Sequence, residues 1–456
     1  MIVMKFGGSS LRDAESLLRV AEIIRSEEEK KKIIVASAVN GVTDHLLASI
    51  RAALENHRGI GSIVEDFHTL HRNLIIGSIP TVEHRLRAMK EVESLLAGFE
   101  KLLFGVAYTG ECTPRMQDRI VSNGERLSAR IVAECLKAHG VESKALDADA
   151  VDIIAVGQWG CGNADLDQIE EKLPNHILPL LERGTIPVIT GFFGRTKDHH
   201  PITFGRGGTD YSAAVVSHAM NAEVLQIWKD VDGFLSASPE IVENPKLVSH
   251  LSYDEAAELA YFGAKILHPR TVEPLHAKQI PIVIKNTYRP EAEGTLISSD
   301  RQGREDVIKS ITFSRNLGII KCLGAGLGCQ VGFLREVISA LGDSDIHTRS
   351  IVTSQTAMSL LVSSGDLEKS SLILRDLQIP YVESIQQIPD IAVIAVVGKG
   401  LAETKGLAAK VLTAVADSNI NVEMMSSGAS RAAYYFLVRD EALEKSIKAI
   451  HAEFFE

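Results

Sequence analysis

The sequence predicts an α/β protein in two parts. A mainly parallel sheet covered by helices on both faces comes first, and two ferredoxin-like βαββαβ units follow. The first observation is that short apolar stretches such as 2–6 and 185–190 alternate with helical segments such as 11–26. Repeated strand–helix units are typical of parallel sheets that are buried on both faces. The second is an internal repeat, in which the pattern of residues 332–346 recurs at 406–420.

Composition is that of an ordinary globular protein. The chain has 456 residues, of which 45% are hydrophobic and 23% charged, so two or three domains with full cores are expected. The formal net charge of −11 argues against nucleic acid or acidic membranes as partners. The five cysteines form no CxxC pair, which argues against a zinc site or a disulfide framework. With no signal peptide and no apolar run of spanning length, we expect a cytoplasmic protein.

The stretch Gly205–Asp210, GRGGTD, is the strongest candidate for a ligand site, since a helical run follows it directly. Glycines let backbone N–H groups approach an anion, and a helix N-terminus favours negative charge. Arg206 adds a bidentate grip on a carboxylate or phosphate, and Asp210 offers a partner for an amine or metal. An apolar strand then ends in Lys229-Asp230-Val231-Asp232-Gly233, and such acidic residues suit the Mg²⁺ of phosphoryl transfer. The alternative is a glycine turn with an Asp cap.

The N-terminus offers a second phosphate-binding arrangement. A short strand carries Lys5, and Gly7, Gly8 and Ser9 then lead into a helix. The spacing differs from a P-loop, in which the lysine follows the glycines. An N-terminal strand with a tight turn explains the same residues.

Several polar residues stand at the ends of predicted strands or helices. Ser37 and Thr43 follow a buried strand, at the edge where open α/β sheets bind ligands. Taken without their neighbours, these two residues are better explained as helix caps. Glu125 lies at a helix start and could bind an amine or simply favour the helix dipole. Lys265, which stands near a glycine, could contact a nucleotide phosphate. The alternative is a lysine on the solvated surface. Residues 44–105 resemble a helical insertion without obvious chemistry.

A charged, turn-rich stretch separates the two parts. The glycines of Gly324–Cys329 are read as a loop of the first repeat rather than as a dinucleotide fingerprint, because the third glycine is displaced. The predicted divisions are a catalytic domain over 1–290, a linker over 291–306 and a regulatory region over 307–456, itself two units at about 316–385 and 386–456.

Six motifs, in order, together resemble aspartokinase: KFGGSS at 5–10, SAVNGVT at 37–43, NGERL at 123–127, FGRGGTD at 204–210, KDVDG at 229–233 and FGAKILHP at 262–269. The tandem repeat resembles the paired ACT domains of that family. The resemblance implies the amino acid kinase fold and ATP-dependent phosphorylation of the side-chain carboxylate of L-aspartate, the first step towards lysine, threonine and methionine. It also implies that the strand at 307–313 joins the later ACT unit. Because the chain ends after the second repeat, a monofunctional enzyme is expected.

The resemblance also assigns roles by position. Lys5, Arg206 and Asp210 are the implied catalytic residues, with ATP and Mg²⁺ as cofactors and no side chain predicted as a dedicated metal ligand. The implied aspartate-binding residues are Ser37, Thr43, Glu125, Arg206, Gly207 and Asp210. The implied ATP-binding residues are Lys5, Gly7, Gly8, Ser9, Lys229, Asp230, Leu235, Lys265 and Ile266. An aspartate side chain is ionised at neutral pH, so the reaction needs no general base.

Two departures from the family bear on ligand choice. Leu235 stands where many relatives have a tyrosine, and Glu240 replaces a phosphate-facing arginine. Arg349 and Gln355 stand where lysine-sensitive relatives carry acidic residues, and an arginine is a poor partner for a lysine ammonium. Threonine, lysine or another amino acid therefore remain open as effector. The implied effector residues, between ACT units of a homodimer or higher homo-oligomer, are Gly332, Leu334, Thr348, Thr353 and Ser354.

Two other readings compete. The chain could be another amino acid kinase, acting on glutamate, acetylglutamate or carbamate, although such relatives generally lack tandem ACT repeats. It could instead be a non-catalytic sensor of ATP and amino acids, built from a decayed kinase. Loss of Lys5, Arg206 or Asp230 would mark that second reading, and all three residues are present.

Overall fold

The computed structural model describes residues 1–264, 266–299, 307–401 and 404–456. Within them the chain forms two compact units. One contains Met1–Phe234, Ser249–Ala257 and Ile266–Arg301, and the other contains Leu235–Val248, Glu258–Lys265 and Gln302–Glu456, apart from the residues outside the description.

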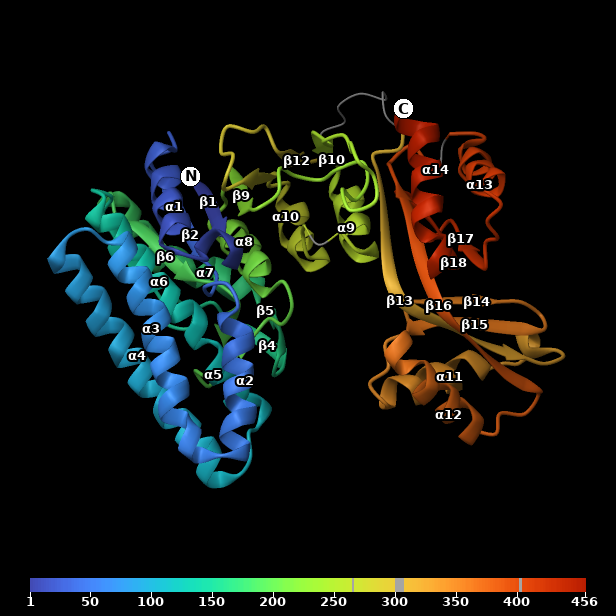
Figure 1. Cartoon of the computed structure of the whole chain (residues 1–456), viewed down its shortest axis with the longest axis horizontal. Helices are drawn as coiled ribbons and strands as arrows, with labels where there is room; N and C mark the ends of the chain where they lie inside the picture. The colour runs from blue at the N-terminus through green and yellow to red at the C-terminus, as the bar shows by residue number, and fades with distance from the viewer. Residues whose placement is uncertain (265, 300–306, 402–403) are drawn as a thin grey trace. The chain divides into compact units, whose positions relative to one another are not determined.

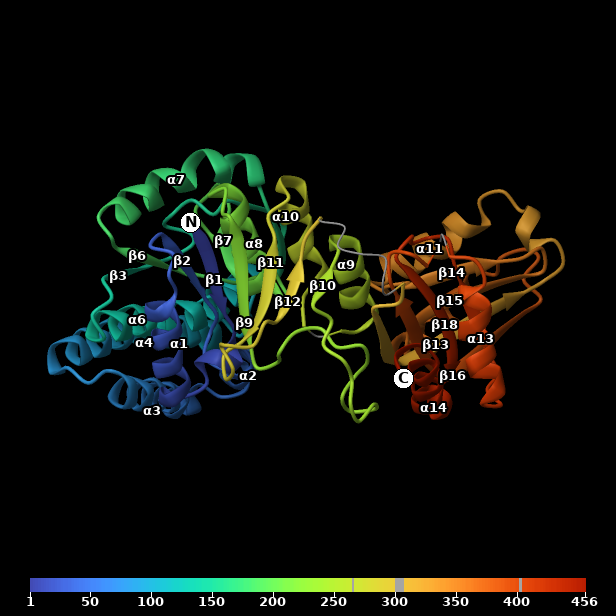
Figure 2. The ribbon, with the colours of Figure 1, turned by 90° about the horizontal axis from the view of Figure 1, so that it is seen from above.

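The first unit is built on an eight-stranded sheet (Figures 1 and 2). All its neighbouring strands run parallel except one pair, β11 and β12. Three of its inner strands, over residues 2–6, 32–36 and 186–190, are buried at every residue, as expected for a sheet covered on both faces. In order across the sheet, the strands are β10 (His250–Leu251), β12 (Thr295–Ile297), β11 (Ile282–Asn286), β9 (Val224–Lys229), β1 (Ile2–Phe6), β2 (Lys32–Ala36), β6 (Ile186–Thr190) and β3 (Ser143–Leu146).

Helices cover both faces of this sheet. Figure 2 shows α7 (Leu166–Glu182), α8 (Gly208–Ala219) and α10 (Val272–Lys278) on one face, and α1 (Ala14–Ser26) and α6 (Asn123–Ala138) on the other. The expected helical insertion is formed by three helices, α2 (Val42–Glu55), α3 (Ile60–Ser78) and α4 (Val82–Thr109). α3 and α4 pack on each other and on the α1/α6 layer, so one face of the sheet, the α1/α6 layer and the insertion share one hydrophobic core.

Smaller elements complete the site end of this unit. The short helix α5 (Pro114–Val121) precedes α6, and α9 (Tyr253–Phe262) follows β10. Two antiparallel hairpins lie outside the main sheet. Their strands are β4 (Ala155–Gln158), β5 (Cys161–Ala164), β7 (Phe193–Arg195) and β8 (Pro201–Thr203).

The second unit is organised around one six-stranded antiparallel sheet. Two strands of 14 residues, β13 and β16, run side by side through its middle, as Figure 1 shows. The first half of β13 pairs with the second half of β16, which pairs with β18. In order, the strands are β14 (Ser350–Thr353), β15 (Ala357–Ser363), β13 (Ser310–Leu323), β16 (Ser384–Val397), β18 (Ala433–Arg439) and β17 (Met424–Ser426).

Each half of this sheet carries a helix pair. The pairs are α11 (Phe333–Asp343) with α12 (Leu367–Asp376), and α13 (Leu407–Asp417) with α14 (Leu443–Phe455). Each pair closes its own hydrophobic core, which agrees with the two ferredoxin-like units predicted from the repeat.

Segment Leu235–Val248 packs with the second unit, whereas the sequence-based division assigned it to the catalytic part. Ala237 and Ile241 belong to the core closed by α13 and α14. Ser236 Oγ lies 2.9 Å from Nε2 of His451 on α14. Apolar burial and this buried hydrogen bond, rather than position in the sequence, therefore decide where the segment belongs.

No helix among the described residues is both long enough and apolar enough to cross a bilayer.

Candidate active site

A cavity of about 520 Å³ lies at the N-terminal end of α8. It forms where parallel strands end, because β1, β2 and β9 are neighbours in the sheet and their carboxyl ends lie at one edge. The sequence-predicted residues that line it are Lys5, Ser37, Thr43, Glu125, Arg206, Gly207 and Asp210. The fold therefore collects in one cavity all six residues predicted for aspartate.

The turn before α8 depends on glycine. Gly205 and Gly207 have φ values of 74° and 70°, in the left-handed region that side chains disfavour. A Cβ on Gly207 would lie 2.4 Å from Cβ of His268. Gly207 is the N-cap of α8, so the free N–H groups of the first turn face the cavity end of the helix.

Asp210, in that first turn, is flanked by two lysines. Its Oδ1 lies 2.5 Å from Nζ of Lys5, and its Oδ2 lies 3.2 Å from Nζ of Lys229. Burial alone would raise the pKa of Asp210, but Lys229 and Lys5 outweigh it and hold the pKa at about 2. Burial lowers the pKa of Lys5, against the opposing attraction of Asp210. The site thus holds one buried carboxylate between two ammonium groups.

The first glycines bring backbone close to Lys5. A Cβ on Gly7 would lie 3.2 Å from Nζ of Lys5, and one on Gly8 would lie 3.3 Å from the carbonyl oxygen of Ala38. Ser9 follows in a single 3₁₀ turn, and its carbonyl oxygen accepts a hydrogen bond from the Tyr288 hydroxyl at 3.1 Å. The loop lies at the end of β1 and places N–H groups near a buried cation.

Glu125 is a buried carboxyl with spare hydrogen-bonding capacity. Its Oε1 accepts the backbone N–H of Ala38 at 3.1 Å. Its Oε2 has no hydrogen-bond partner among the described residues, although the side chain is only 1% exposed. Burial raises the pKa of Glu125 to about 8, with the Ala38 N–H opposing it. A cationic ligand group entering the cavity would provide the missing partner.

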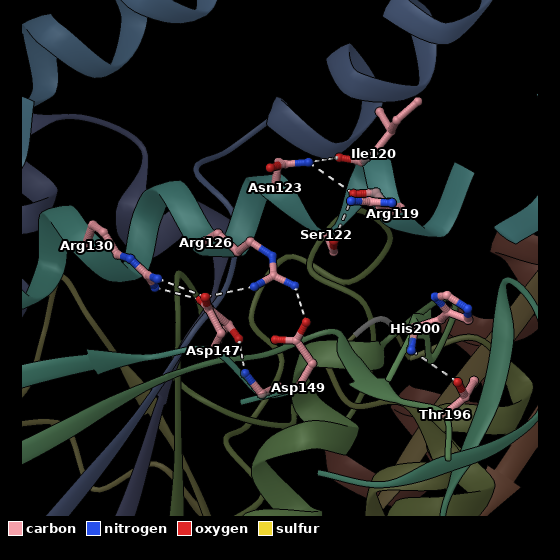
Figure 3. Close-up of polar contacts among 12 residues, drawn as sticks. Arg119, Ile120, Ser122, Asn123, Arg126, Arg130, Asp147, Asp149, Thr196 and His200 are labelled. Carbon is pink, nitrogen blue, oxygen red and sulfur yellow. Dashed lines mark hydrogen bonds and ion pairs between the residues drawn. The ribbon is translucent and has the colours of Figure 1, made fainter. Parts of the chain in front are cut away.

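The helix that carries Glu125 is fixed by an ionic network, shown in Figure 3. Arg126 Nη1 lies 2.8 Å from Asp147 Oδ2, and its Nη2 lies 2.6 Å from Asp149 Oδ2. One turn further along, Arg130 binds Asp147 in a bidentate pair at 2.6 and 2.8 Å. Bidentate pairs combine energy with fixed geometry, so the network anchors α6 beside the cavity.

The KDVDG motif provides groups with different roles. Lys229 ends β9 and contacts Asp210, while Asp230 is exposed. Asp232 is engaged elsewhere, because Asn286 Nδ2 donates to its Oδ1 at 2.7 Å and Arg289 pairs with its Oδ2. Within the described part of the chain no cluster of three or more His, Cys, Asp or Glu side chains is arranged to hold a metal.

Leu235 and Ile266, two of the predicted nucleotide residues, fall in different units of the chain. Leu235 belongs to the second unit, where its carbonyl oxygen accepts a hydrogen bond from Ser310 at 2.6 Å. Glu240, in the same segment, is exposed. Ile266 is half-buried in the first unit, and Lys265 lies outside the described residues.

The predicted effector residues all lie in the first repeat of the second unit. Gly332 is the N-cap of α11, with a φ of 90°, and Leu334 is 45% exposed. Thr348 precedes β14 and Thr353 ends it. The loop before α11 packs closely against the turn between β14 and β15, since a Cβ on Gly328 would lie 2.6 Å from the carbonyl oxygen of Ser354.

Asp44, Gln117 and Asp118 are among the polar residues that line the cavity and that the sequence analysis did not predict. Asp118 is 1% exposed and accepts three hydrogen bonds, so burial raises its pKa while those bonds oppose the shift. Asp44 follows Thr43 in the first turn of α2, where a negative charge is stabilised by the helix dipole. No local pattern distinguished them from helix-surface residues.

Comparison with known proteins gives a consistent result. The amino acid kinase family model matches residues 1–286, and an ACT domain model matches residues 394–454. Aspartokinase 1, chloroplastic, from Arabidopsis thaliana is 32% identical over all of the chain and 80% of its own length. Aspartokinase 3 from the same plant is 33% identical, over all of the chain and 81% of its length.

Solved structures agree along the whole chain. The structure of E. coli aspartokinase III in complex with aspartate and ADP superposes with a TM-score of 0.84 at 26% identity, covering 100% of both chains. The aspartate kinase of Clostridium acetobutylicum gives a TM-score of 0.79 at 30% identity, again over 100% of both chains.

Proposed function

The chain belongs to the aspartokinases of the amino acid kinase family, and we propose that the cavity at the N-terminus of α8 is its aspartate site. The reaction is transfer of a phosphoryl group from ATP to the side-chain carboxylate of L-aspartate, the first step towards lysine, threonine and methionine, under amino-acid feedback. The observation that supports the proposal is one cavity lined by a guanidinium, a buried ammonium and a buried carboxyl oxygen that has no partner among the described residues.

Charge complementarity orients the substrate. Arg206 takes the α-carboxylate, since a guanidinium binds a carboxylate through two parallel hydrogen bonds. Glu125 takes the α-ammonium through Oε2, the acceptor without a partner among the described residues. Ser37 and Thr43, which also line the cavity, add hydroxyl donors. The reactive carboxylate then points towards Lys5 and Asp210.

The phosphoryl group is stabilised electrostatically. Lys5 and the backbone N–H groups of Gly7 and Gly8 neutralise the oxygens of the transferring group, while Asp210 fixes the positions of Lys5 and Lys229. Because the acceptor is already ionised at neutral pH, positioning and charge neutralisation account for the catalysis.

Mg²⁺ enters with the nucleotide in this proposal. Kinase sites hold it through one or two carboxylates, phosphate oxygens and water, and the exposed Asp230 fits that role better than the paired Asp232 or Asp210. When bound, the ion offsets the negative charge of the phosphates. Lys229 and Ile266, both in the first unit, complete the proposed nucleotide contacts.

An amino acid regulates the enzyme from the second unit, and E. coli aspartokinase III has been solved with lysine and aspartate. Here Arg349 is exposed, and its Nη1 donates to Ser314 Oγ at 3.2 Å. Its charge disfavours an effector with a second ammonium. We propose threonine as the effector, bound near Gly332, Thr348 and Thr353 between the ACT units of a homodimer.

The test is ADP release by the purified protein with Mg·ATP and, separately, L-aspartate, L-glutamate, N-acetyl-L-glutamate or carbamate, each alone and with threonine, lysine or methionine. We expect turnover with L-aspartate and with none of the other three acceptors, and we expect threonine to inhibit it. The product should be an acyl phosphate that hydroxylamine traps. Turnover with another acceptor would point to a different amino acid kinase. ATP binding without turnover would favour the sensor reading.

A further inference from the structure

Arg270, which ends the sequence stretch FGAKILHPR, ties together the elements around the substrate turn. Its Nη1 donates to the carbonyl oxygen of Phe204 at 2.8 Å. Its Nη2 donates to the carbonyl oxygen of Gly162 at 2.6 Å and to Asn163 Oδ1 at 2.8 Å. Its guanidinium also lies 4.5 Å from the centroid of the Tyr211 ring. One side chain thus joins the residue before the turn, the β4–β5 hairpin and α8.

Asp118 on α5 makes a second set of bonds to the same two segments. Its Oδ2 accepts the backbone N–H of Thr203 and that of Gly160, both at 2.9 Å. Its Oδ1 accepts the Thr203 hydroxyl at 2.8 Å. The hairpin in turn packs on the turn, because a Cβ on Gly205 would lie 2.9 Å from the carbonyl oxygen of Gly160.

These bonds precede a segment that has little stiffness of its own. Three of the four residues of Gly205–Gly208 are glycines, and glycine has the largest conformational freedom in an unfolded or mobile chain. Only Arg206 in that segment has a side chain, and the proposed function assigns it the substrate carboxylate. Its position therefore depends on what holds residues 203 and 204 on one side and α8 on the other.

We propose that Arg270 and Asp118 are positioning residues that fix the substrate-binding conformation of Arg206. Neither acts on the reacting atoms in this account. The inference rests on the proposed aspartate site, because it concerns the residue that grips the substrate there. A displacement of about 1 Å at such a site is enough to cost about 100-fold in rate.

The experiment measures kcat and both KM values for Arg270→Gln, Arg270→Lys, Arg206→Gln and the double variant Arg206→Gln/Arg270→Gln. Arg183→Gln is the matched control, because Arg183 is exposed at the end of α7 and its side chain makes no ion pair or hydrogen bond within the described residues. Thermal unfolding of each variant separates local from global damage. Asp118→Asn provides an independent route to the same turn.

We expect Arg270→Gln to raise the KM for aspartate about 10-fold and to leave the KM for ATP within about 2-fold, because a carboxylate grip contributes to binding of substrate and transition state alike. Arg270→Lys keeps the positive charge near Tyr211 but loses the planar set of guanidinium N–H donors. We therefore expect a smaller rise in the KM for aspartate than in Arg270→Gln. In the Arg206→Gln background, loss of Arg270 should add little, which is the signature of a residue that acts through Arg206.

An unchanged aspartate KM in Arg270→Gln, or equal effects on both substrates together with a lowered unfolding temperature, overturns the inference. Full additivity in the double variant does the same. If Arg270→Gln fails to fold, Arg270→Lys and Asp118→Asn replace it. In each of them the change in the KM for aspartate is compared with the change in the KM for ATP. If Arg206→Gln itself leaves the aspartate KM unchanged, the proposed aspartate site fails instead, and the two failures are distinguishable.

Discussion

We predict that binding of aspartate depends on pH through Glu125. The carboxyl has a raised pKa of about 8 because it is buried. Its Oε2, which has no hydrogen-bond partner in the described part of the chain, is the proposed acceptor for the substrate ammonium. Only the ionised form attracts a cation strongly, so the protonated enzyme is a poor binder near neutral pH. Binding of aspartate must then displace the proton.

The magnitude follows from the fraction of Glu125 that is ionised. With a pKa of about 8, roughly 1% is ionised at about pH 6, roughly 10% at about pH 7 and half at about pH 8. Apparent affinity scales with the fraction in the competent form. The KM for aspartate should therefore fall about 10-fold for each unit between about pH 6 and pH 7.5 and level off above about pH 8.

The assay is ADP release at saturating Mg·ATP across this range, with the KM for ATP as an internal control. Glu125→Gln should raise the aspartate KM and abolish its pH dependence, since the amide does not titrate. Calorimetric titration at about pH 7 in buffers of different ionisation enthalpy should show release of nearly one proton per aspartate. A wild-type aspartate KM that stays constant from about pH 6 to pH 8 would refute the reasoning.

Three further outcomes follow from the same site. Lys5→Ala should lose two or more orders of magnitude in kcat, because one oriented donor to a transferring group contributes roughly 3–4 kcal/mol; near-normal turnover would remove Lys5 from the mechanism. Gly207→Ala should raise the aspartate KM at least about 10-fold through its clash with His268, whereas Gly110→Ala, with the same left-handed φ and nothing within 4 Å, should leave it unchanged. Glu125→Gln should unfold at a higher temperature than wild type, by a margin that grows from about pH 6 to pH 9. The folded protein alone keeps the Glu125 proton between its unfolded pKa near 4.5 and about 8, so this carboxyl costs more stability as pH rises; a margin that shrinks with pH would contradict the assignment.

The main sheet and the position of the cavity could be predicted from the sequence, because the residues that indicate them are neighbours in the chain. Each strand end carries its polar residues next to it, and parallel strands bring those ends to one edge. The anion site at the start of α8 was likewise predictable, because the glycines of Gly205–Gly208 stand directly before the helical run. The internal repeat predicted two similar units, because each unit needs its own apolar pattern to form its own hydrophobic core.

Features that depend on distant contacts were not accessible. Asp118 lies on a short helix whose sequence gives no hint of Thr203 and Gly160, residues far along the chain. Asp232 stands in an acidic motif that suits a metal, yet Asn286 and Arg289 engage it. Segment Leu235–Val248 follows the nucleotide motif in sequence but packs into the core of the second unit through Ala237 and Ile241.

The most direct test of the aspartate site is a crystal structure with L-aspartate and ADP. We expect the α-carboxylate to lie within hydrogen-bonding distance of Arg206, the ammonium beside Oε2 of Glu125 and the side-chain carboxylate on the Lys5 side of the cavity. Aspartate bound outside this cavity, or bound within it with its ammonium away from Glu125, would contradict the account.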